Sequence, residues 1–168
     1  MAVRHIVPIL LLATSLVAAF GSPASGEKPT VLRGAGSALE GDVVSVSGSM
    51  VRLEGIDAPD PGQTCRTRHG SDYDCYTAAR SQLQSMLDLG EVTCTVHATD
   101  RTQHRIGACK VLGKDLAAAM LVRGWALAYR QLSQEYGGLE ARAQARKAGL
   151  WAGRVEAPWQ WRTRQLNQ

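Results

Sequence analysis

The chain has 168 residues, of which 45% are hydrophobic and only 5% aromatic. This is the length of one domain with a core of its own, packed mostly by leucine, valine and alanine, and the sequence shows neither repeats nor a second domain. Nineteen basic against fifteen acidic residues give a net charge of +4. Such a balance favours a polyanionic partner only weakly, because many exported proteins are mildly basic.

Residues 1–24 have the pattern of a secretory signal peptide, with Arg4 and His5 before the apolar run 6–20 and small residues after it. Cleavage after Ala19 or after Ala24 fits equally well, and an uncleaved membrane anchor is the alternative. No later stretch approaches the length of a bilayer span. We therefore expect an exported mature chain, periplasmic or extracellular, that does not engage a membrane.

All four cysteines follow this leader, which in an oxidising compartment predicts two disulfides: Cys65, Cys75, Cys94 and Cys109. Four cysteines allow three pairings. A hairpin bent at 100–103 would bring Cys94 opposite Cys109, and Cys65 with Cys75 would close a short polar loop. A zinc site is the rival interpretation, but the chain has no C-x-x-C pair.

The hydrophobic pattern predicts strands, then a helix, and then the same again. Apolar and polar residues alternate loosely over 31–39, 43–46 and 50–56, and the last two can form a hairpin around Ser47-Gly48-Ser49. The long loop 60–74 follows. A helix starts near Thr77 and stops at Gly90.

The second half of the chain repeats this change of period. Strands are predicted over 91–99 and 104–112, a helix from its N-cap Asp115 to Gly124, and a last helix over 133–148. A helix between the third and fourth of five strands is how a Greek-key OB barrel is connected. We expect an α+β fold: a five-stranded antiparallel OB-fold barrel with about three helices.

Acidic residues gather where two of these strands meet. The strand that carries Arg52 ends in Asp57-Ala58-Pro59-Asp60, and Asp42 precedes its hairpin partner. The hairpin would place Asp42 near Asp57, and two carboxylates forced together need a cation or a shared proton. The pattern favours a divalent cation with a phosphate-binding arginine beside it.

These residues resemble the core of the staphylococcal nuclease-like (thermonuclease) family. The resemblance rests on Gly41-Asp42, on the run from Val51 to Asp60, and on the order of further matches over roughly residues 31–162: Asp100-Arg101, Ala126-Leu127-Ala128-Tyr129-Arg130 and Gly149-Leu150-Trp151. It implies that Asp42, Asp57 and the backbone carbonyl of Ala58 hold Ca2+. It also implies that Arg52 grips the scissile phosphate and that Tyr129 lies in a base-stacking region.

Three positions depart from the family pattern. Asp60 stands where the family has the glutamate proposed to activate water, and Val43 replaces a threonine. His104 takes the place of a phosphate-contacting arginine, so that either His104 acts as a proton donor or Arg105 substitutes through a bulge.

The sequence therefore predicts an exported, monomeric, Ca2+-dependent nuclease that hydrolyses DNA or RNA with little sequence preference. Asp60 is its expected base. The alternatives are a catalytically weakened OB-fold protein that binds nucleic acid or another polyanion, and an envelope accessory protein with a protein or polysaccharide partner.

Overall fold

The computed structural model describes residues 29–100, 104–129 and 136–168. The predicted signal peptide, residues 101–103 of the predicted bend at 100–103 and the start of the predicted last helix therefore lie outside the described residues. Within the described ranges, no helix is both long and apolar enough to cross a bilayer.

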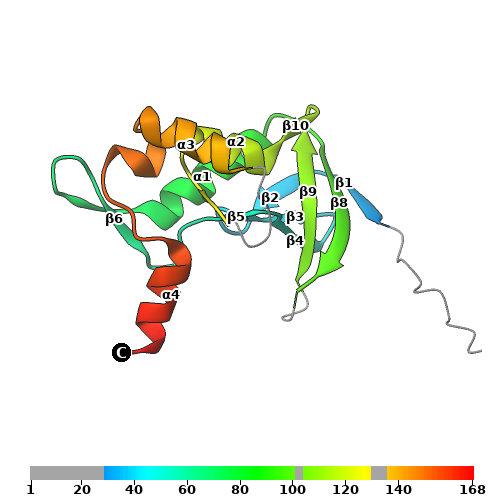
Figure 1. Ribbon diagram of the computed structural model, residues 1–168. Helices are drawn as coiled ribbons and strands as arrows, with labels where there is room; N and C mark the ends of the chain where they lie inside the picture. The colour runs from blue at the N-terminus through cyan, green and yellow to red at the C-terminus, as the bar shows by residue number, and fades with distance from the viewer. Residues whose placement is uncertain (1–28, 101–103, 130–135) are drawn as a thin grey trace, which may run out of the picture.

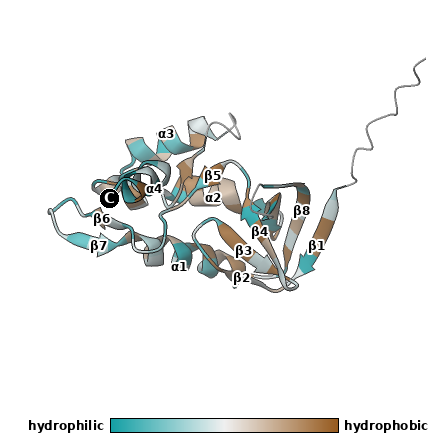
Figure 2. Cartoon of the chain, turned by 90° about the horizontal axis from the view of Figure 1, so that it is seen from below, coloured by the Kyte–Doolittle hydropathy of each residue, from teal (hydrophilic) through white to brown (hydrophobic). Residues whose placement is uncertain are grey.

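A curled sheet forms a half-barrel at one side of the molecule (Figure 1). Its strand order is β1 (Thr30–Gly34), β8 (Val92–Thr99), β9 (Arg105–Val111), β4 (Ser49–Leu53), β3 (Val43–Val46) and β2 (Gly36–Ala38), with β10 (Lys114–Asp115) added beside β9. Hydrophobic residues are visible on strands of this sheet, β1 and β3 among them (Figure 2). This confirms the predicted α+β, OB-like fold.

Two of the predicted strands are divided. The segment expected at 31–39 is β1 and β2, which pair with β8 and β3 respectively. The segment expected at 50–56 ends as β4 at Leu53, and Gly55, with a φ of 76° that favours glycine, turns the chain into β5 (Ile56–Asp57). β5 then pairs with β11 (Leu127–Ala128), away from the main sheet.

The sheet is not antiparallel throughout, because β4 and β9 pair in parallel. The long connection through α1 (Cys75–Leu87) returns the chain to the sheet as the antiparallel hairpin β8–β9. A parallel pair needs such a crossover, because a tight turn reverses the chain and so joins only antiparallel strands. The register sets Arg52 beside Ile106, which fixes the neighbours of the predicted phosphate-binding arginine.

Aspartate side chains cap the first two helices. The cap at Asp115 was predicted, whereas α1 was expected to start near Thr77 and starts at Cys75. Asp74 caps α1, and Asp115 caps α2 (Leu116–Arg123), which ends at Gly124 in the left-handed conformation. α3 (Gly137–Ala145) and the 3-10 turn η1 (Gly149–Ala152) follow.

The structure also has a helix that the sequence analysis did not predict, α4 (Pro158–Leu166). The tail 150–162 was expected only to pack the chain end through its tryptophans. Pro158 at the first helical position is a local start signal that was missed. α4 extends away from the rest of the molecule at the side opposite β1 (Figure 1).

Both predicted disulfides are confirmed. Cys94 and Cys109 are register partners across β8 and β9 and are bonded. Cys65 and Cys75 join the hairpin β6 (Thr64–Arg66) and β7 (Asp72–Asp74) to the start of α1.

We expect removal of the Cys94–Cys109 disulfide by a double change to alanine to lower the free energy of unfolding by about 3 kcal/mol, because the bond closes a 15-residue separation and restricts the unfolded chain. Urea unfolding measures this. The double alanine variant of Cys65 and Cys75 serves as the comparison. It removes a disulfide that closes a separation of 10 residues, so its free energy of unfolding should fall slightly less. An unfolding curve unchanged from wild type would contradict the prediction.

Candidate active site

Asp42 and Asp57 are brought to one place by the turn that precedes β3. The backbone N–H of Leu53 donates to the Asp42 carbonyl at 2.8 Å, which joins this turn to the end of β4. A Cβ atom on Gly41 would lie 2.7 Å from the Cβ of Ala58, so a side chain there would push the turn away from the residue next to Asp57. Both aspartates are almost fully buried, at 3% and 5% exposure.

Arg52 connects Asp42 to the hairpin β8–β9. Its Nη1 lies 3.1 Å from Asp42 Oδ2, and its Nε lies 4.0 Å from Asp100 Oδ2. Asp100 in turn accepts a hydrogen bond from the backbone N–H of His104 at 2.9 Å, and the Nδ1 of His104 lies 3.5 Å from its Oδ2. The structure thus groups Asp42, Arg52, Asp100 and His104 in one connected row.

Arg105 does not join this row. The parallel register places it beside Val51, whereas Ile106 lies beside Arg52. Because successive side chains of a strand point to opposite faces, Arg105 leaves β9 on the face opposite Arg52. Its Nη1 donates to the hydroxyl of Ser49 at 2.6 Å. Of the two residues considered for the family's second arginine, His104 is therefore the one that the fold places near Arg52.

Arg162 of α4, a residue that the sequence analysis missed, binds Asp57 and Asp60. Its guanidinium donates to both oxygens of Asp57, at 3.2 and 2.6 Å, and to Asp60 Oδ2 at 2.8 Å. Gln63 supports this arrangement, because it accepts from the Asp60 N–H and donates to the Glu156 carbonyl just before α4. No sequence spacing reveals a contact that spans about a hundred residues.

Burial makes the negative charges of this site costly. Burial raises the pKa of Asp42 to about 7, with Asp57 adding repulsion and Arg52 opposing the rise. Burial also raises the pKa of Asp60, and the Arg162 guanidinium opposes that shift. Asp42, Asp57 and Asp60 therefore lie within electrostatic reach of one another, and together they require positive charge.

The donor chemistry of this cluster fits Ca2+, which prefers carboxylate and carbonyl oxygens. Asp42, Asp57 and the carbonyl of Ala58 are donors of that kind. In the arrangement described, each of the two carboxylates instead faces an arginine. Among the described residues, no group of three or more acidic, histidine or cysteine side chains is gathered as a ready metal cage.

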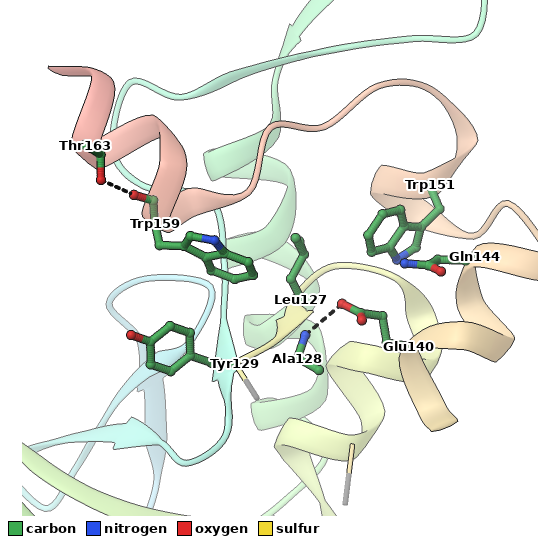
Figure 3. A pocket seen from close by; sticks show the side chains of 8 residues that line it. All are labelled: Leu127, Ala128, Tyr129, Glu140, Gln144, Trp151, Trp159 and Thr163. Atoms are coloured by element: carbon green, nitrogen blue, oxygen red, sulfur yellow. Dashed lines mark hydrogen bonds between the residues drawn. The ribbon is translucent and has the colours of Figure 1, made fainter. Parts of the chain in front are cut away.

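Tyr129 lines a pocket that adjoins this cluster through the pairing of β11 with β5. The pocket has a volume of about 510 Å3, and its walls include Trp159 and Thr163 from α4, Trp151, Glu140 and Gln144 (Figure 3). The ring centres of Tyr129 and Trp159 are 5.7 Å apart, with a tilt of 53° between the rings. The buried indole N–H of Trp151 has no hydrogen-bond partner among the described residues.

We expect the Asp42→Asn variant to show how burial of this carboxylate affects stability. The folded-state pKa of about 7 lies above the ordinary 3.8, so between these values the folded protein binds more protons than the unfolded chain. The contribution of Asp42 to the unfolding free energy therefore falls as pH rises through this window. Relative to Asp42→Asn, the wild type should be about 2 kcal/mol more stable at pH 5 than at pH 8, as measured by urea unfolding in EDTA. A difference that does not change with pH would contradict this.

Comparison with known proteins identifies the family of this chain. The succinoglycan biosynthesis protein ExoI of Rhizobium meliloti (strain 1021) is 29% identical over 127 residues, which are 73% of this chain and 66% of that protein. The chain thus spans just under two thirds of the length of this relative. Residues 50–153, which include Arg52, Asp57, Asp60 and His104, match the model of the staphylococcal nuclease homologue family. This match covers more than half of the chain, and the protein therefore belongs to the staphylococcal nuclease homologue family.

Proposed function

We propose that the protein is an exported, Ca2+-dependent nuclease that hydrolyses phosphodiester bonds of DNA or RNA with little sequence specificity. Membership of the family supports a role as a nuclease or a nucleic-acid-binding protein. The observation that carries the finer proposal is the position of Arg52 between Asp42 and Asp100, with the buried Asp57 close enough to Asp42 to raise the cost of ionising it. This arrangement joins a phosphate-binding group to oxygen donors suited to Ca2+.

Arg52 is the phosphate-binding residue of this proposal. A guanidinium presents two parallel N–H donors to a phosphate and stabilises the negative charge that builds up as the phosphorus is attacked. Its side chain is 30% exposed, so a substrate can reach it. Asp42 and Asp100 hold the side chain from two sides and orient it before substrate binds.

Asp60 and His104 supply the proton transfers. Asp60 takes a proton from the attacking water, whose oxygen forms a bond to phosphorus while the ester P–O bond breaks. His104 returns a proton to the departing oxygen, and its contact with Asp100 orients the ring for this step. Burial moves the pKa of Asp60 upward, toward neutral pH, which suits a general base.

Asp42, Asp57 and the Ala58 carbonyl are the groups that would hold Ca2+. When bound, the ion supplies charge neutralisation at the phosphate and favours ionisation of a water molecule. Val43, in place of the family's threonine, is a buried residue without a hydroxyl, so this chain cannot offer that oxygen near the ion. We therefore expect weak binding of Ca2+.

The Tyr129–Trp159 pocket suits a nucleobase. Aromatic stacking accepts any base, which agrees with the proposed lack of sequence specificity. The pocket adjoins the cluster because Leu127 pairs with Asp57. A nucleic acid bound at the aspartate cluster therefore has this pocket beside Asp57 as a place for a neighbouring base.

Export is supported by the two disulfides, which persist in oxidising compartments. The unit that we propose to be secreted is the domain over residues 31–162, separated from the leader 1–24. A monomer is sufficient for this function, since one chain supplies every residue named above.

The second candidate is a protein that binds single strands without cutting them. The observation that favours it is the ion pair of Arg162 with Asp57 and Asp60, which occupies both the proposed ligand and the proposed base. Such a protein would bind nucleic acid in a salt-dependent manner that EDTA does not alter.

We expect the disulfide-bonded protein to cleave single-stranded DNA in millimolar Ca2+ and not in EDTA. Asp57→Ala should abolish cleavage, because it removes a proposed ligand. Arg52→Lys should lower kcat by roughly a hundredfold or more, since it keeps the charge and loses the forked donor. Arg66→Lys, at an exposed ion pair with Asp72 on the β6–β7 hairpin, is the matched control and should keep full activity. Cleavage in EDTA, or full activity in Asp57→Ala, would reject the proposal, and binding without cleavage would favour the second candidate.

Trp159→Ala should weaken binding of a short single-stranded DNA about tenfold, because stacking on an aromatic ring contributes roughly 1–3 kcal/mol per base. Fluorescence anisotropy in EDTA measures this affinity without cleavage. Trp159→Phe keeps a stacking surface and should restore most of the affinity. Equal affinities for Trp159→Ala and the wild type would show that the pocket does not hold a base.

A further inference from the structure

Arg162 occupies the carboxylates that the proposed function assigns to the cation and to the base. Both Asp57 oxygens accept hydrogen bonds from this one guanidinium, from Nη1 at 3.2 Å and from Nη2 at 2.6 Å. Nη1 also donates to Asp60 at 2.8 Å. Asp57 is buried, so few other directions of approach to its oxygens remain. A divalent cation at about 2.3–2.6 Å from an Asp57 oxygen would lie close to the guanidinium that already donates to both oxygens of this buried carboxylate, and the two positive charges would repel each other.

We propose that Arg162 is a built-in counter-cation of the Asp57–Asp60 pair, and that Ca2+ and the Arg162 guanidinium bind Asp57 in mutually exclusive states. This inference rests on the proposed function for the identity of the cation. It goes beyond that function in making α4 a part of the cation site. The contact is autoinhibitory, since it withholds a ligand and the base together.

Charge balance favours one cation at the Asp57–Asp60 pair over two. Asp57 raises the cost of ionising Asp60, and both of these carboxylates raise the cost of ionising Asp42. The guanidinium supplies one positive charge to this cluster and remains protonated, because the two carboxylates raise the pKa of Arg162 above its ordinary value. A divalent ion placed beside the same guanidinium would meet like charge at close range, which is unfavourable at partly buried sites.

The position of Arg162 allows it to leave the site without unfolding the domain. Its side chain is 42% exposed, whereas that of Asp57 is 7% exposed. α4 is anchored at its start, through the buried Pro158 and through the bond from Gln63 to the Glu156 carbonyl. Residues 163–168 are all exposed, and the helix extends away from the body of the molecule (Figure 1). A rotation of the side chain, or a swing of the helix about its anchored end, therefore releases Asp57.

Displacement also reaches the aromatic pocket. Trp159 and Thr163 lie three residues before and one residue after Arg162 on α4, and both line the pocket wall (Figure 3). Movement of α4 therefore changes the wall against which a base would stack. The cation site and the pocket are thus coupled through one helix.

Calorimetric titration of the disulfide-bonded protein with Ca2+ alone tests this proposal. Arg162→Gln keeps a polar side chain, shorter than that of arginine, but removes the charge, and it should bind Ca2+ about tenfold more tightly than the wild type. Arg164→Gln is the matched control: Arg164 lies two residues further along α4, pairs with Glu156, and touches neither Asp57 nor Asp60. Its Ca2+ affinity should equal that of the wild type.

Thermal unfolding gives a second readout that is independent of activity. Without Ca2+, Arg162→Gln should melt at a lower temperature than the wild type, because Asp57 and Asp60 then repel each other without a counter-ion. Saturating Ca2+ should raise the Tm of this variant by more than it raises that of the wild type.

The outcomes separate this inference from the proposed function. Equal Ca2+ affinities for Arg162→Gln and the wild type would overturn the inference and leave a Ca2+-dependent nuclease in place. Weaker Ca2+ binding in Arg162→Gln would also overturn it, since Arg162 would then support the ion. No binding of Ca2+ by either protein would overturn both the inference and the proposed role of Ca2+.

Discussion

The need to neutralise buried carboxylates organises this molecule. Asp42 and Asp57 are enclosed by the turns at the end of the half-barrel, where an ionised carboxylate without a partner is strongly unfavourable. Two arginines from separate parts of the fold meet this need. Arg52 comes from the sheet, and Arg162 comes from the last helix. The site is therefore also a point at which the C-terminal helix is fastened to the barrel.

The two arginines differ in how firmly the fold holds them. Arg52 belongs to a central strand whose neighbours on both sides, β3 and β9, are hydrogen-bonded to it. Its position follows from the sheet itself. Arg162 belongs to a helix that is largely exposed and anchored at one end, and its position depends on the carboxylates that it binds. An arrangement of one fixed and one releasable cation is what the proposed exchange of Arg162 for Ca2+ requires.

Features encoded by neighbouring residues were predictable from the sequence. The Asp115 cap, the hairpin around Ser47-Gly48-Ser49 and the two disulfides all follow from local signals or short separations, and the structure confirms them. The parallel pairing of β4 with β9 and the contact of Arg162 with Asp57 were not predictable in this way. They depend on how elements far apart in the chain meet, and no periodicity or cap encodes that meeting.

Asp60, at the position where the family resemblance implies a glutamate, gains a physical interpretation from this arrangement. One nitrogen of Arg162, Nη1, donates to both Asp57 and Asp60, so the two carboxylates are held within the reach of a single guanidinium. The shorter aspartate side chain keeps its carboxylate near the backbone turn that Gln63 fixes through the Asp60 N–H. Asp60, Gln63 and Arg162 therefore form one supported unit with α4. In this chain residue 60 and the C-terminal helix are best understood together, because the negative charge of Asp60 and the positive charge of Arg162 on α4 balance each other.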